Sequence, residues 1–275
     1  MVETTIRSRF PRPWFTYTLR VVVIAYLVLL VAWPLSLVAR NALADGLGPF
    51  VDNLTEPVVI EALKLTVVAA GTAVVVNTVF GVAISLLLVR YEFPGKRLLN
   101  ALVDLPLSVS PIVVGLALLL VYNVRDGWFG PTLKDNGIQI LFATPGIAMA
   151  TAFVVLPLVI RELVPVLEEL GTDAEQAAAS LGASGPQTFW RITLPTIRWA
   201  LLYGIVLSLA RALGEFGAVK IVSGNVIGRT QTATLVVEER YQEFAPSTAY
   251  AIAFLLAAIA VAAIVTVSLL RHDHH

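Results

Sequence analysis

The sequence predicts an all-α fold, a polytopic membrane helical bundle with about six transmembrane helices in one domain. Of the 275 residues, 57% are apolar and 14% are charged, whereas a soluble domain carries about 25% charged residues. Several apolar stretches reach the ~20 residues that a helix needs to cross a membrane. The remaining segments are too short for a soluble domain. We therefore expect one transmembrane domain over residues 21–270, between an N-terminal segment (1–20) and a short tail (271–275).

Six stretches qualify as membrane spans. The first follows four arginines and superficially resembles a signal peptide, but it continues for 19 residues, Val21 to Ala39, and no small-residue cleavage site follows it. Prolines fall inside several spans, Pro34, Pro106, Pro111 and Pro157 among them, which a bundle tolerates where neighbouring helices satisfy the freed carbonyl groups. The expected spans are 21–39, 62–89, 98–122, 140–160, 197–222 and 248–270.

The basic residues indicate an orientation. If both termini are cytoplasmic, the inside segments hold eleven Lys and Arg residues and the outside segments hold six, as the positive-inside rule requires. Two further basic residues, Lys64 and Arg211, lie within spans. The loop from Arg161 to Arg198 then falls on the cytoplasmic side.

The composition also excludes several kinds of chemistry. The chain has no cysteine, and its three histidines (His272, His274 and His275) lie in the last four residues, so the spans offer no thiolate or imidazole. A net charge of zero provides no basic field for nucleic acid. The phosphate-binding pattern G-x-x-x-x-G-K-[ST] is absent. We expect no enzyme activity, metal or cofactor in this chain and no nucleic-acid partner.

The 161–198 loop contains the stretch "EQAAASLGASGPQTFWRITLP", in which alanines and polar residues stand between two long apolar runs. Thr172 and Glu175 have capping-box spacing, which predicts a helix from 173 to 181 that ends at Gly182. Ser184 and Gln187 repeat the spacing, which predicts a second helix toward Pro195. The loop is thus expected to form two short helices with a tight elbow.

The first of these helices has very small side chains on one face. If Ala177, Ala178 and Ala179 are exposed, a partner's backbone could approach closely, with Phe189 and Ile192 as an apolar anchor. Alternatively, the alanines pack against the protein's own spans. The residues alone leave both interpretations open.

The same loop resembles the EAA loop of ABC importer permeases, whose pattern is Glu-Ala-Ala, three residues, Gly, nine residues, Ile-x-Leu-Pro. The spacing matches throughout, except that Gln176 replaces the Glu and Glu175 stands beside it. The resemblance implies a coupling helix docked on a dimer of ABC ATPase subunits, which would hold ATP and Mg. The residues that it implicates are Glu175, Gln176, Ala177, Ala178, Gly182, Phe189, Ile192 and Pro195.

Two charged residues, Arg211 and Glu215, fall well inside the fifth predicted span, away from its ends. Arg211 and Glu215 are four apart, so they are expected to pair along one helix face. The pair could lock helix packing, break and form as a gate moves, or present Arg211 to a passing oxyanion, for which a guanidinium is well shaped. Ser108 and Ser110 flank Pro111, and their hydroxyls could donate to the same anion or bond their own helix.

The stretches "DLPLSVSPIVVGLA" and "ARALGEFGAVKIVSGN" resemble the permeases of sulfate, thiosulfate and molybdate importers, and with "TFWRITLP" they look most like the CysW-type family. The resemblance implies a type I importer permease of a bacterial inner membrane. Its implied partners are a second permease subunit, expected to be a sister chain, an extracytoplasmic sulfate-binding protein and membrane lipid. A molybdate or tungstate permease and an ion-gradient-driven transporter are the alternatives.

Overall fold

The computed structural model describes residues 13–272, and within that range the chain is helical with no strand, as predicted. Five helices are long and apolar enough to cross a membrane, and a bent pair makes up to six. Most of the N-terminal segment, with Arg7, Arg9 and Arg12, and the tail residues His274 and His275 lie outside the described residues.

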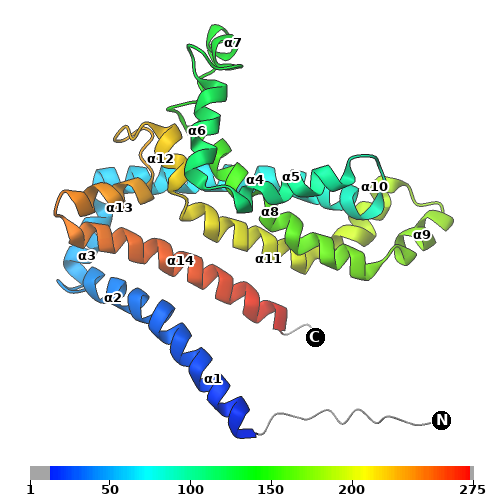
Figure 1. Ribbon diagram of the computed structural model, residues 1–275, viewed down its shortest axis with the longest axis horizontal. Helices are drawn as coiled ribbons and strands as arrows, with labels where there is room; N and C mark the ends of the chain where they lie inside the picture. Colours follow the sequence, from blue (N-terminus) through cyan, green and yellow to red (C-terminus); the bar gives the residue numbers. More distant parts are fainter. Residues whose placement is uncertain (1–12, 273–275) are drawn as a thin grey trace.

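The first span is one long helix at the edge of the bundle, with α2 beside α14 and the α1 end diverging from the other helices (Figure 1). It comprises α1 (Pro13–Leu27), the π-helical turn η1 (Val28–Ala32) and α2 (Trp33–Ala42). The π turn directly precedes Pro34, which has no N–H to donate and whose ring crowds the preceding carbonyl, so the local helix widens. No residue in the apolar window of this span is buried within the chain.

Three spans form the core of the molecule, namely α4 (Pro57–Arg90), α8 (Thr144–Leu170) and α11 (Leu194–Leu213). They pack side by side around Val159, Leu163 and Leu167, which are fully buried. Two glycines allow the close approach, because a Cβ at Gly204 would lie 3.1 Å from the Cα of Val159 and one at Gly81 would lie 3.0 Å from its side chain. The last span, α14 (Pro246–His272), packs on α11 and α2.

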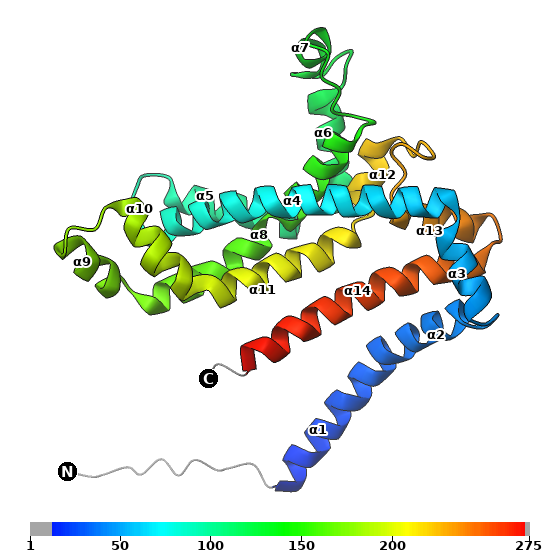
Figure 2. The same ribbon diagram turned by 180° about the vertical axis from the view of Figure 1, so that it is seen from behind.

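The third predicted span, 98–122, is not one straight helix. It consists of α5 (Lys96–Ser108) and α6 (Pro111–Tyr122), which meet at an angle of 113°. Ser110 precedes a proline and is extended, with φ −60° and ψ 135°, because the α conformation is disfavoured before proline. In Figures 1 and 2, α6 and the short α7 (Gly130–Asp135) project from the bundle as an arm.

The fifth predicted span, 197–222, is also interrupted. Helix α11 ends at Leu213, and α12 (Gly217–Ser223) follows, with Gly214 and Gly217 flanking the break because glycine is a poor helix former. A Cβ at Gly217 would lie 3.2 Å from the Cβ of Pro111. The two helix breaks therefore pack directly against each other.

The two ends of the bundle differ in structure. One end, here called the loop end, carries α9 (Asp173–Ser180), α10 (Gly185–Thr188) and η2 (Phe189–Thr193). The opposite end carries α3 (Leu47–Thr55) and α13 (Ala233–Gln242) (Figure 2). Helix α1 begins and α14 ends on the side of the loop end.

Candidate functional site

Glu175 in α9 is turned into the protein and joins four helical elements. Its carboxylate accepts from Arg90 at the end of α4, with Nε to Oε2 at 2.9 Å and Nη2 to Oε1 at 3.3 Å, and from the Thr193 hydroxyl at 2.9 Å. Arg90 Nη1 also donates to the carbonyl of Leu167 in α8 at 3.0 Å. The Arg90 and Glu175 side chains are 12% and 23% exposed. This ionic tie fixes α9 against α4, α8 and η2.

The tie shows that the predicted capping box at Thr172 and Glu175 was wrong. The Glu175 carboxylate is engaged by Arg90, and the Thr172 hydroxyl instead accepts from Gln176 Nε2 at 2.7 Å. A guanidinium 85 positions away provides a stronger partner than a backbone N–H. Gln176 itself is exposed.

The second predicted cap is confirmed. The Ser184 N–H donates to Gln187 Oε1 at 2.8 Å, and the helix that follows begins with Gly185 and Pro186. Gly182, with φ +85°, makes the elbow between α9 and α10. Helices α10, η2 and α11 then continue without interruption, so the loop's second helix is the first part of a membrane span.

Ala177, Ala178 and Ala179 do not all share one environment. Ala178 is buried, at 7% exposure, as the packing interpretation expects, whereas Ala177 and Ala179 are exposed, as the docking interpretation expects. A cavity of about 260 Å³ opens beside Gly182 and Ile192. Phe189 and Ile192 are half-buried, and Pro195 is exposed in the first turn of α11.

Sequence reasoning missed the bulky apolar groups on this surface. Leu181 and Trp190 are 90% and 66% exposed, on either side of the elbow. It also missed Arg90, although an arginine that closes a 34-residue apolar helix needs either water or an anionic partner.

The second candidate group lies at the helix breaks. Arg211 Nη1 is 2.8 Å from Glu215 Oε2, and their side chains are 44% and 1% exposed. The expected ion pair is present, but it bridges the break after Leu213 and does not run along one helix face. Glu215 Oε1 also accepts from the Ala218 N–H at 3.2 Å, at the start of α12. Glu215 is thus a buried anchor, and Arg211 is the accessible member.

Ser108 and Ser110 lie at the break between α5 and α6, and both are exposed. Neither hydroxyl has a hydrogen-bond partner within residues 13–272, so the structure does not show the expected alternative of a bond to their own helix. Because Pro111 packs on Gly217, the segments 104–117 and 210–225, which contain these breaks, lie together.

Comparison with known proteins identifies the family. The family model described as "Binding-protein-dependent transport system inner membrane component" matches residues 77–273. The chain is 49% identical to the sulfate transport system permease protein CysW of Synechococcus elongatus, over 90% of this chain and 86% of that protein. It is 42% identical to CysW of Escherichia coli K12 (98% and 94% covered) and 36% identical to CysT of the same organism (97% and 95%).

A solved structure shares the fold of this chain. A chain of a bacterial ABC transporter involved in the import of the acidic polysaccharide alginate superposes with a TM-score of 0.77, covering 95% of this chain and 96% of that one at 16% identity. The chain therefore belongs to the family of binding-protein-dependent transport system inner membrane components, the permeases of ABC importers.

Proposed function

We propose that this chain is the CysW-type permease subunit of an importer for sulfate or thiosulfate. The observation that carries the proposal is the identity to sulfate permeases over nine-tenths or more of the chain. The accessible guanidinium of Arg211 supports it, because a planar, permanently charged fork suits a tetrahedral oxyanion.

In this proposal the buried Glu215 weakens the binding of an anion by Arg211, so that Arg211 binds the anion only transiently. A carboxylate 2.8 Å from the guanidinium offsets part of its charge, so an anion is attracted without being held tightly. Ser108 and Ser110 add free hydroxyl donors near the same helix breaks. In this proposal the four residues form the narrow part of the path, and movement at the breaks opens it.

The ATPase partner would dock at the loop end. Leu181 and Trp190 provide exposed apolar anchors beside the elbow at Gly182, and Gln176 and Ala177 are also exposed there. The partner would bind ATP and Mg, since this chain carries no phosphate-binding loop. Its closure would move α9, and the ionic tie of Arg90 and Glu175 would transmit that movement to α4 and α8.

The other partners follow from similar reasoning. A second permease subunit would complete the path, and a sister chain fits because one organism has both a CysW and a CysT relative. An extracytoplasmic sulfate-binding protein would deliver the anion at the α13 end. The excess of basic residues on the predicted inside segments supports a cytoplasmic position for the loop end and both termini.

Uptake of radiolabelled sulfate into right-side-out vesicles, which hold the complete transporter with its loop end inside, tests the proposal. We expect uptake to require ATP at the loop end and to be inhibited by thiosulfate more strongly than by molybdate. Stronger inhibition by molybdate would assign the chain to molybdate or tungstate transport. Uptake driven by an ion gradient without ATP would refute the importer proposal.

A further inference from the structure

Helix α5 has three faces of different character. Val103 and Pro106 are buried against the bundle, and Val103 packs in a cluster with Leu88 and Ile160. Leu98 and Leu102 form an exposed apolar face, with 65% and 52% exposure. A third face carries polar side chains at intervals of three to four residues, which places them on one line along the helix. This polar stripe consists of Arg97, Asn100, Asp104 and Ser108.

An ion pair stands in the middle of the polar stripe. Arg161 of α8 donates from Nε and Nη2 to Asp104 Oδ1, at 3.1 and 3.0 Å. The side chains of Arg161 and Asp104 are 56% and 46% exposed, so this chain does not enclose them. The neighbouring residues in each helix, Val103 and Ile160, are 3% and 2% exposed, so the pair sits on a packed support.

Both members of the ion pair lie in helices that are long and apolar enough to cross a membrane, Arg161 in Thr144–Leu170 and Asp104 in the bent pair of α5 and α6. Arg161 is nine residues before Leu170, where α8 ends at the loop end, and at 1.5 Å per residue this puts it about 14 Å along the helix from that end. Asp104 is eight residues into α5, or about 12 Å. Half-exposed charges at this depth need water or protein around them, because hydrocarbon does not solvate them.

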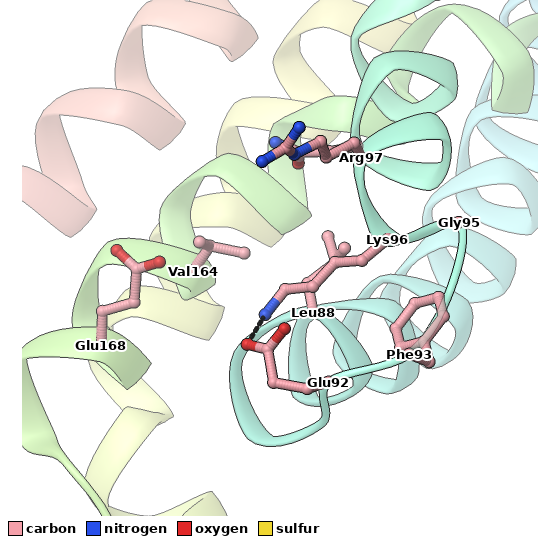
Figure 3. Close-up of a pocket in the computed structure, with 9 residues that line it drawn as sticks. Leu88, Glu92, Phe93, Gly95, Lys96, Arg97, Val164 and Glu168 are labelled. Carbon is pink, nitrogen blue, oxygen red and sulfur yellow. Dashed lines mark hydrogen bonds and ion pairs between the residues drawn. The ribbon is translucent and has the colours of Figure 1, made fainter.

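The polar stripe runs from the helix break at Pro111 to the cavity that Figure 3 shows. Its inner end, Ser108, adjoins the break where Pro111 packs on Gly217, two residues after Glu215. Its outer end opens into a cavity of about 540 Å³ lined by Arg97, Asn100 and Glu168, among others. Figure 3 shows Arg97 and Glu168 on different sides of this cavity and Lys96 paired with Glu92.

The position of Arg161 relative to Arg211 follows from helix packing. Gly204 of α11 lies level with Val159 of α8. Arg161 is two residues toward the loop end from that level and Arg211 is seven residues away from it, so the two guanidinium-bearing positions are about 13 Å apart along the bundle. Along the bundle axis, Arg161 therefore lies between the level of Arg211 and the loop end.

We propose that the polar stripe of α5 lines the cytoplasmic half of the anion path and that Arg161, partly neutralised by Asp104, is a second binding station for the oxyanion on its way out. This inference rests on the proposed function for the direction of transport and the identity of the anion. The offset of charge by Asp104 has a physical purpose, since a fully charged guanidinium at the exit would retain a divalent anion.

The absence of cysteine from the chain allows a direct test of the path. Asn100→Cys and Ser108→Cys place a thiol on the polar stripe, and Leu98→Cys and Leu102→Cys place matched thiols on the apolar face of the same helix. A charged, membrane-impermeant thiosulfonate is added to inside-out vesicles that hold the complete transporter, with and without ATP and vanadate. The fraction of this chain modified is then measured.

We expect the stripe thiols to react at least about tenfold faster than the apolar-face thiols in one nucleotide state or both, because an apolar environment suppresses the reactive thiolate. Equal rates on both faces, or stripe thiols that are unreactive in every state, would show a dry helix contact and overturn the path. The same vesicles, preloaded with radiolabelled sulfate and the sulfate-binding protein, report ATP-driven release of sulfate before labelling. An absence of ATP-driven release with the labelling pattern intact would therefore refute sulfate as the substrate but not the path along the stripe.

Asp104→Asn tests the binding station, because it leaves Arg161 uncompensated. Sulfate preloaded on the cytoplasmic side should then inhibit uptake at a concentration about fivefold lower, as expected for one partly exposed charge contact. The double variant Asp104→Asn with Arg161→Gln should remove this effect. Unchanged inhibition by preloaded sulfate, in membranes that hold normal amounts of Asp104→Asn, would refute the station.

Discussion

Glu175→Gln is the most informative single change to the coupling loop. The substitution keeps the shape of the side chain and removes the charge that accepts two hydrogen bonds from Arg90 and one from Thr193. It also leaves the Arg90 guanidinium, only 12% exposed, without its counter-ion.

The expected magnitude follows from these contacts. A hydrogen bond to a charged group contributes about 1.5–3 kcal/mol, and partial exposure of Glu175 reduces the sum through solvent screening. We therefore expect the docked position of α9 to lose about 2–3 kcal/mol, which multiplies the population of the released loop by about 30 to 150. A released α9 still binds the ATPase through Leu181 and Trp190 but no longer moves α4 and α8 with it.

The assay is the ratio of sulfate transported to ATP hydrolysed in proteoliposomes that contain the assembled transporter. We expect Glu175→Gln to lower this ratio several-fold while ATP hydrolysis continues. Glu169→Gln is the matched control, since it removes an exposed carboxylate at the end of α8 and should leave the ratio unchanged. An unchanged ratio in Glu175→Gln, with the complex fully assembled, would refute the role of the ionic tie.

Three further substitutions have distinct expected results. Gly182→Val forces a branched residue to φ +85°, at a cost of about 1–3 kcal/mol, so ATP hydrolysis should uncouple from uptake while the chain remains at normal levels in membranes. Arg211→Ala should lower sulfate uptake while the amount of chain in membranes stays normal; a reduced amount of this variant would indicate a packing role for Arg211 instead. Glu215→Ala should lower the amount of chain, because it removes the buried carboxylate that caps α12. Gly217→Val should destabilise the chain by about 1–3 kcal/mol in thermal unfolding, since its Cβ would lie 3.2 Å from that of Pro111; unchanged stability would mean that the two breaks separate freely.

Hydropathy located all six apolar stretches, but it ended the fourth ten residues before Leu170, began the fifth twelve residues after Gly185, and did not reveal the two breaks. An apolar stretch such as 98–122 has the same mean hydropathy whether it is straight or bent by 113°. Pro111 and Gly217 were both visible in the sequence, but their effect depends on the contact between them, across about a hundred residues of chain. A bundle tolerates many prolines, so a single one does not predict a break.

In the 161–198 loop, too, the sequence predicts the helices better than the directions of their side chains. Its helices and elbow follow from local rules, and the Ser184 cap formed as those rules predict. The direction of Glu175 does not, because its choice between the backbone of Thr172 and the guanidinium of Arg90 is decided by how α4 ends in space. For the same reason, the spacing of the alanines could not show that Ala178 alone would be buried.

The π turns fix the rotational phase of the two helices that contain them. Each turn, η1 before Pro34 and η2 before Pro195, accommodates one residue more than an α turn and so shifts everything on its far side by about 100° around the helix axis. In η2 this shift sets Thr193 toward Glu175 while Trp190 points outward. A return to α geometry would rotate the surface of α9 and α10 about the α11 axis, so Pro195 holds that surface at a defined angle to the rest of the bundle.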